Sequence, residues 1–215
     1  MKNKNIKRHA GGLWITMGLL LIAAALFLSA YNFYDEQRAG QSAAQAADRL
    51  EQLMSERSSP EDLGQVAGEG EATLPDYMLF PQMEMPVQNV AGVDYIGVLL
   101  IPALELELPV ISQWSYPNLQ TAPCRYSGSA YLNNLILCAH NYSTHFGGLK
   151  DLQEGDSAIF TDVDGNVFTY RMALREVLNP TDIEEMESGD WDLTLFTCTL
   201  GGKTRVTVRF ELEEA

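Results

Sequence analysis

An uncharged, apolar stretch from Ala10 to Tyr34 constrains the fold of this chain more than any other feature of its sequence. A helix needs about 20 mostly apolar residues to cross a bilayer, and the stretch provides them. Basic residues precede it and none follows at once, which is typical of a cytoplasmic amino terminus. We therefore expect a cytoplasmic tail at residues 1–10, a membrane anchor at 11–34 and an extracellular remainder. A cleaved signal peptide is the alternative, since Ser29-Ala30 offers small residues, but Leu28 fits poorly where cleavage requires one.

The part of the chain that follows this stretch is strongly acidic. All 29 Asp and Glu residues lie in it, whereas four of the 14 Lys and Arg residues precede the stretch, so its formal charge is about −19. Such a surface repels polyanions, which argues against a nucleic-acid partner. It is compatible with cations such as calcium, although the same charge also serves simply to keep a surface soluble.

Composition divides the extracellular part into three segments. Residues 35–59 are expected to form a helical stalk, because apolar residues recur at spacings of four and three positions on one helical face. Glycines among acidic residues indicate a flexible linker over residues 60–73. From there on, short runs of β-forming residues separated by Pro, Gly and Asx predict an all-β domain at residues 74–215. The residues of the stalk face are Ala43, Ala47, Leu50 and Met54.

Within that domain, apolar runs and turn residues predict the individual strands. Asp162 to Asn166 combines Gly with Asx residues and therefore suits a tight hairpin turn. Phe146 to Leu152 is expected to form one or two helical turns. The last strand alternates apolar and polar residues, so one of its faces is core and the other is polar. The expected strands are Tyr95–Ile101, Leu106–Ile111, Leu135–Ala139, Ala158–Thr161, Val167–Val177, Leu193–Cys198 and Arg205–Leu212.

Three residues at strand ends provide the groups that acyl transfer to a thiol requires. A thiol becomes a strong nucleophile beside a base or a cation, and the reaction needs a donor for the oxyanion it creates. Cys198, His140 and Arg205 are the candidates for these roles. Two glycines between Cys198 and Arg205 suit a hairpin, whereas His140 must be brought in by tertiary folding. A lone cysteine is usually a small buried side chain and a lone histidine often a core residue, so the surrounding motifs decide.

Other residues compete with these assignments. Arg209 shares a strand face with Arg205 and is its rival for the substrate, although Arg205 is nearer the turn. His145 is expected to be a solvated loop residue rather than part of the site. Cys124 and Cys138 either form a disulfide or remain as buried thiols. No metal site is expected, because the sequence contains neither Cys-x-x-Cys nor His-Glu-x-x-His.

Several short motifs follow one another through the β domain. They are Tyr95-Ile96-Gly97, Ile101-Pro102, Tyr126-Ser127-Gly128-Ser129, Ala139-His140-Asn141, Phe146-Gly147-Gly148-Leu149, Gly155-Asp156, and Thr194-Leu195-Phe196-Thr197-Cys198 followed by Arg205. Their order and spacing resemble those of the sortases, the membrane-anchored cysteine transpeptidases of mainly Gram-positive bacteria. The resemblance implies a closed eight-stranded β-barrel with short helices. In that barrel His140 follows one strand, Cys198 ends another and Arg205 begins its neighbour.

The resemblance also implies a reaction that needs no cofactor. The thiolate of Cys198 would cleave an LPXTG-like sorting signal after its threonine and form a thioacyl-enzyme. An amine of lipid II or a wall peptide, or a pilin lysine, would then complete the transfer. His140 would act as general acid and base, and Arg205 would hold the substrate backbone and the oxyanion. A catalytically silent surface binding module and a hydrolase of the same fold are the alternatives.

Two segments bear on the sortase subclass, which stays open. The acidic run from Asp182 to Asp192 falls where some sortases bind substrate and, in certain members, calcium, although a solvated loop is the simpler interpretation. Leu74 to Pro81 corresponds in position to the lid of pilin-polymerising sortases and could form an extended cover over the site. It lacks their Asp-Pro-aromatic order, so pilus assembly is not favoured over wall anchoring.

Overall fold

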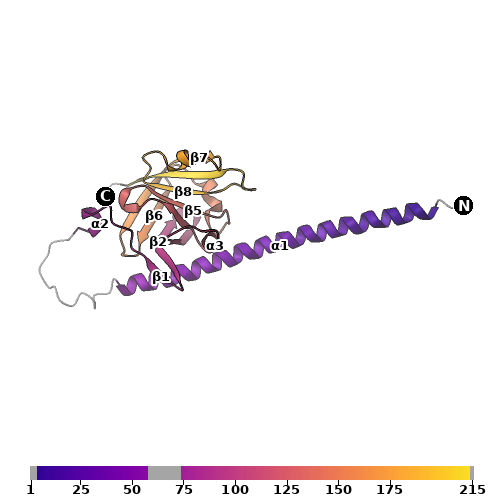
Figure 1. Ribbon diagram of the computed structural model, residues 1–215, viewed down its shortest axis with the longest axis horizontal. Coiled ribbons are helices and arrows are strands. Elements are labelled where there is room, and N and C mark those ends of the chain that lie inside the picture. Colours follow the sequence, from indigo (N-terminus) through magenta and orange to yellow (C-terminus); the bar gives the residue numbers. More distant parts are fainter. Residues whose placement is uncertain (1–3, 58–73, 214–215) are drawn as a thin grey trace. The chain divides into compact units, whose positions relative to one another are not determined.

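The computed structural model describes residues 4–57 and 74–213 (Figure 1). It divides into two compact units, Met1–Arg38 and Ala39–Ala215. One long helix, α1 (Lys4–Arg57), begins in the first unit and ends in the second. Its part from Gly12 onward is long and apolar enough to cross a membrane, judged by length and composition. The predicted linker at residues 60–73 and the last two residues of the predicted stalk lie outside the described residues.

Within the second unit, the end of α1 packs against the β domain through the face that the sequence singled out. Leu50 is fully buried there, and Ala43 and Ala46 belong to the same hydrophobic core as side chains of the strands. A Cβ atom at Gly40 would come within 2.8 Å of the methyl carbon of Thr144, so the close approach of the helix requires glycine at this position. Residues 39–57 are therefore part of the folded domain.

Eight strands, β2 to β9, close into a barrel, which confirms the predicted fold. Their order is β2-β3-β4-β5-β8-β9-β7-β6, and the pairing of β2 with β6 closes the ring. A ninth short strand, β1, pairs with the start of β2. The pairs β3–β4 and β5–β8 are parallel and the others are antiparallel. The strands are β1 (Gln88–Val90), β2 (Val93–Ile101), β3 (Leu106–Ile111), β4 (Cys124–Ser127), β5 (Leu135–Ala139), β6 (Ser157–Asp162), β7 (Val167–Leu178), β8 (Leu193–Cys198) and β9 (Arg205–Leu212).

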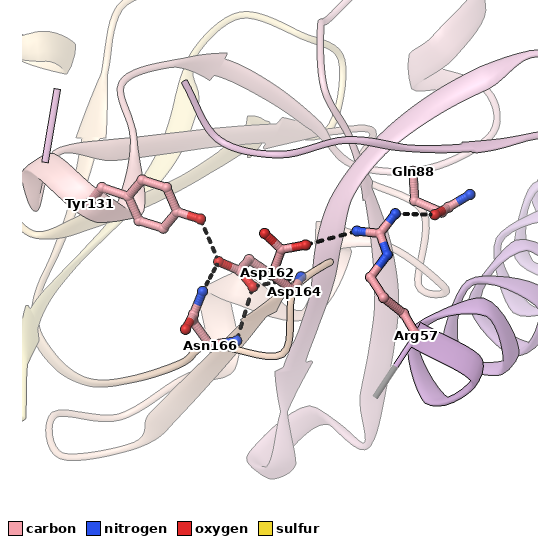
Figure 2. Close-up of polar contacts among 6 residues, drawn as sticks. All are labelled: Arg57, Gln88, Tyr131, Asp162, Asp164 and Asn166. Atoms are coloured by element: carbon pink, nitrogen blue, oxygen red, sulfur yellow. Dashed lines mark hydrogen bonds and ion pairs between the residues drawn. The ribbon is translucent and has the colours of Figure 1, made fainter. Parts of the chain in front are cut away.

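A buried carboxylate organises the hairpin between β6 and β7, as Figure 2 shows. Asp162 is fully buried and accepts hydrogen bonds from the backbone N–H groups of Asp164 and Asn166, the side-chain amide of Asn166 and the hydroxyl of Tyr131. Arg57, the last residue of α1, forms an ion pair with Asp164 at 2.7 Å and donates to Gln88. The predicted Asx-Gly turn is confirmed, and it also holds the end of the long helix.

Short helices occupy several of the connections between strands. The segment before the barrel forms α2, whose Tyr77 stacks on Tyr131 with ring centroids 4.7 Å apart. The predicted helical turns near Phe146 are confirmed as the 3₁₀-helix η4. The short helices are α2 (Asp76–Leu79), η2 (Pro102–Leu104), α3 (Tyr116–Leu119), η3 (Ala130–Leu132), η4 (Phe146–Asp151) and α4 (Ile183–Glu187).

Both faces of β9 are covered. Val208 and Phe210 point into the barrel core, as the alternating pattern predicts. The polar face also carries buried residues, Thr207 and Arg209. They are covered because the connection between β7 and β8, which contains α4, folds over this face and receives hydrogen bonds from Arg209.

Candidate active site

The hairpin of β8 and β9 places Cys198 beside Arg205. The two residues are the register partners next to the turn of the hairpin, and side chains of directly opposed residues project from the same face of a sheet. The turn is closed by a hydrogen bond from the Thr199 N–H to the Thr204 carbonyl at 2.9 Å. Gly201 has a φ of +83° and the next residue is also a glycine with positive φ, so the turn depends on these glycines.

Parallel pairing of β5 with β8 brings His140 to the same end of the sheet. Ala139 and Thr197 are the last register partners, so His140 and Cys198 occupy the next position on each strand. The hydroxyl of Thr197 donates to the Ala139 carbonyl at 2.8 Å and fixes this end of the pair. The ring of His140 lies 5.1 Å, centroid to centroid, from that of Tyr142. The parallel pairing therefore brings His140 to the same end of the sheet as Cys198, although the two residues are far apart in the sequence.

Cys198, His140 and Arg205 line one cavity of about 290 Å³, and each is half-buried. One wall comes from the connection between β3 and β4 and the other from the connection between β7 and β8. Aromatic and aliphatic side chains dominate both walls. The first wall contains Trp114, Tyr116 and Leu119, and the second contains Asn179, Pro180, Asp182, Ile183 and Met186. The strands β4, β5 and β8 also line the cavity, through Tyr126, Cys138, Ala139, Phe196 and Thr197. The cavity can therefore hold an apolar peptide segment beside a thiol, an imidazole and a guanidinium.

The other two cysteines are set apart from Cys198 by their burial. Cys124 and Cys138 are register partners on β4 and β5, and both are free, buried thiols. Burial raises the pKa of Cys124 to about 12. Burial, and next the neighbouring Cys124, raises the pKa of Cys138 above its usual range. Because the thiolate is the reactive form, these two thiols are poor nucleophiles, whereas Cys198 is accessible at the cavity.

The structure separates the two arginines that compete for the substrate. Arg205 is half-buried and lines the cavity, where its guanidinium bonds to carbonyls of its own turn, those of Gly202 and Thr204. Arg209 is only 2% exposed and donates to Glu176, to Thr194 and to two backbone carbonyls of α4. Of the two guanidinium groups, only that of Arg205 is therefore open to a ligand in the cavity.

Several expectations about neighbouring residues need correction. His145 is fully buried, not solvated, and its ring packs against that of Tyr142. The segment Leu74–Pro81 does not cover the cavity, since α2 packs on Tyr131 and none of its residues lines the cavity walls. The acidic run is in part structural: the carboxylate of Asp192, for example, accepts the Leu212 N–H at 2.7 Å. Within the described residues, no three His, Cys, Asp or Glu side chains gather as a metal site.

Comparisons with known proteins agree with this fold. The family model described as Sortase domain matches residues 99–213. Sortase C1 from Streptococcus suis is 26% identical, with a TM-score of 0.50 over 56% of this chain and 74% of its own. A sortase D5 transpeptidase from Clostridium perfringens is 17% identical, with a TM-score of 0.56 over 83% and 99%. Clostridium perfringens sortase C, solved with the C-terminal cell wall sorting motif, is 22% identical, with a TM-score of 0.51 over 80% and 91%. No curated protein matches the chain significantly.

Proposed function

Because this chain belongs to the sortase family of cysteine transpeptidases, we propose that it cleaves an LPXTG-like sorting signal and joins the cleaved protein to an amine. The observation that carries the proposal is the meeting of Cys198, His140 and Arg205 in one cavity beside the turn of the β8–β9 hairpin. A thiol, a proton carrier and a permanent cation are the groups that acyl transfer through a thioester requires.

The first half of the reaction forms the acyl-enzyme. The thiolate of Cys198 attacks the carbonyl carbon of the threonine in the signal, and a tetrahedral oxyanion results. Arg205 donates hydrogen bonds to this oxyanion and so stabilises it. When the intermediate collapses, the C–N bond breaks and His140 gives its proton to the leaving nitrogen. The tail of the signal departs as an amine and the rest stays bound to Cys198 as a thioester.

The second half of the reaction returns the enzyme to its starting state. A primary amine attacks the thioester carbon, and His140 removes a proton from that nitrogen. The C–S bond breaks, Cys198 leaves as the thiolate, and a new amide joins the two partners. An amine of lipid II, a wall peptide or a pilin lysine meets this requirement. The thioester conserves the energy of the cleaved bond, so no cofactor is needed for the transfer.

The walls of the cavity and the long helix support the choice of substrate and place. Leu119, Ile183 and Met186 give the cavity apolar walls that suit the leucine and proline of such a signal. The apolar part of α1 suits an anchor in the cell membrane, and the basic residues before it favour a cytoplasmic amino terminus with the barrel outside. The enzyme would then meet its substrates at the outer membrane surface.

Intact-protein mass spectrometry on a panel of sorting-signal peptides tests the proposal, because it detects the acyl adduct directly. We expect an adduct on the wild-type protein that a primary amine discharges as a new amide. Cys198→Ala should abolish both steps, whereas Cys124→Ala, which removes a buried thiol outside the cavity, should retain them. Release of free acid even with excess amine would favour the hydrolase. A folded wild-type protein that forms no adduct with any peptide would favour the silent binding module.

A further inference from the structure

The most deeply buried cation of the barrel wall is Arg209, which lies under the connection between β7 and β8. Its side chain is 2% exposed, and it is the largest of the fully buried side chains. Nε donates to the carboxylate of Glu176 at 2.9 Å. The two terminal nitrogens donate to the carbonyls of Glu185 at 2.6 Å and Met186 at 2.7 Å, and one of them also donates to the hydroxyl of Thr194 at 3.0 Å. Four of its hydrogen bonds thus bind three segments together.

The two carbonyls belong to α4, a helix of a single turn. The last carbonyls of a helix have no partner within it, and in α4 the guanidinium supplies two of the missing donors. Its positive charge also lies at the carboxyl end of the helix, where a cation is favourable. The side chain of Met186 makes a second contact with the strand, because the Thr207 hydroxyl lies 4.0 Å from its sulfur in donor geometry. Arg209 therefore fixes the position of α4 on the barrel.

The same helix forms a wall of the active-site cavity. Ile183 and Met186 line the cavity, and Asn179, Pro180 and Asp182 of the same connection line it as well. Arg209 itself does not line it. The guanidinium thus touches the wall from behind, while Cys198 and Arg205 are held by the strand register of β8 and β9. The two tasks of holding the reacting groups and holding the wall are carried by different contacts.

Charge gives a reason for an arginine at this position. The segment from residue 179 to 192 contains six acidic residues and no Lys or Arg. Their mutual repulsion opposes a compact fold of the connection, and a buried guanidinium beneath it offsets that repulsion. A buried guanidinium is itself costly unless it is paired and fully hydrogen-bonded, and the Glu176 carboxylate and the two carbonyls meet that requirement.

We infer that Arg209 is a positioning residue that sets the apolar wall of the cavity and so determines how tightly the sorting signal binds, with its guanidinium in the place of a bound metal cation. The inference rests on the proposed function, since it concerns the substrate of that same cavity. It assigns to the acidic connection an internal cation, whereas the sequence left calcium as a candidate there.

The test compares Arg209→Gln and Arg209→Lys with Arg171→Gln in the full chain in detergent micelles. Arg171 is the matched control: it lies on β7, pairs with Glu213 and is well exposed, away from α4. For the peptide that serves the wild type best, Arg209→Gln should raise KM about tenfold and change kcat less than about threefold, since the reacting groups stay in register. The KM of Arg209→Lys should lie between those of the wild type and Arg209→Gln, because one ammonium cannot bond to both carbonyls and the carboxylate at once. Arg171→Gln should leave both constants unchanged.

A second readout does not depend on activity. A protease that cleaves after glutamate can attack α4 at Glu184, Glu185 and Glu187 once the helix is released from the barrel. Cleavage there, mapped by mass spectrometry, should be about tenfold faster in Arg209→Gln than in the wild type, with other sites unaffected. If cleavage within α4 is faster in Arg209→Gln but even the wild type transfers no peptide, the positioning role stands and the proposed function fails. If the wild type is active and both Arg209 variants match it in KM and in cleavage, the inference is wrong.

A calcium arm completes the test. With Arg209 as the cation of this wall, the wild-type KM should differ less than about twofold between a chelator and millimolar calcium. A KM that drops about tenfold on adding calcium would mean that an ion, not the guanidinium, holds the wall, and would overturn the inference.

Discussion

Leu50→Ala tests whether α1 is part of the folded domain. Leu50 is fully buried between the helix and the barrel, with Ala43 and Ala46 beside it in the same core. Removing three buried carbon atoms from a leucine costs about 2–5 kcal/mol, depending on how far the site collapses. A helix that lies on the outside of a barrel can settle inward, so we expect a value near the lower end, about 2–3 kcal/mol. For a domain of this size that corresponds to a fall in Tm of about 4–12 °C.

Thermal unfolding of the unit from Ala39 to Ala215, followed by circular dichroism, measures this change. Gln45→Ala is the matched control, because Gln45 lies on the exposed face of the same helix and its loss should cost less than about 0.5 kcal/mol. If both variants unfold within about 2 °C of the wild type, the helix contributes nothing to the domain and the packing argument is refuted. The barrel would then be complete from Leu74 onward.

Three further predictions concern the site and the membrane. Arg205→Lys should lower kcat about 100-fold with a smaller change in KM, because one ammonium cannot replace a planar guanidinium at the oxyanion. A variant as active as the wild type in steady-state assays would contradict the role of Arg205 at the oxyanion. A thiol reagent at pH 7–9 should label Cys198 alone, since burial raises the pKa of Cys124 to about 12 and so keeps that thiol protonated until well above its ordinary pKa of 9.0. Peptide mapping should show Cys124 and Cys138 labelled only after unfolding, and labelling of either in the native protein would contradict their burial. Protease added to intact cells should digest the barrel, and protection of its carboxyl terminus until lysis would reverse the proposed topology.

The strands were predictable because their signals are local. Each alternating or continuous apolar run between Pro, Gly and Asx residues became a strand whose ends lie within two residues of the expected ones, and Leu193–Cys198 shows no shift at all. The Asp162–Asn166 turn was also predictable, since the side chain of Asp162 accepts hydrogen bonds from backbone N–H groups of the same turn. The strands that the sequence did not predict, β1 and β4, are short and lack a strong alternating pattern. They owe their form to pairing with neighbours.

The surroundings of the site were less predictable because they depend on distant segments. His145 looked like a loop residue by its neighbours, yet tertiary packing buries it at the start of η4. The stalk face of α1 was visible as a periodicity, but the sequence did not say what covers it. The cavity walls, including Trp114 and Met186, come from two connections whose paths no local pattern specifies. Alternation places Arg209 on the polar face of its strand, opposite to Val208 and Phe210, and the distant α4 buries it there.

Arg205 and Arg209 illustrate why one strand face can serve two purposes. Their spacing puts both guanidinium groups on the same side of β9, and from the sequence either could meet the substrate. Distance along the strand decides between them. Arg205 lies opposite Cys198 beside the turn, where it lines the cavity, whereas Arg209 lies under α4 and donates to two of its backbone carbonyls. An identical Arg→Lys change should therefore act on different constants at the two positions: on kcat at Arg205, where charge develops, and on KM at Arg209, where the wall is held.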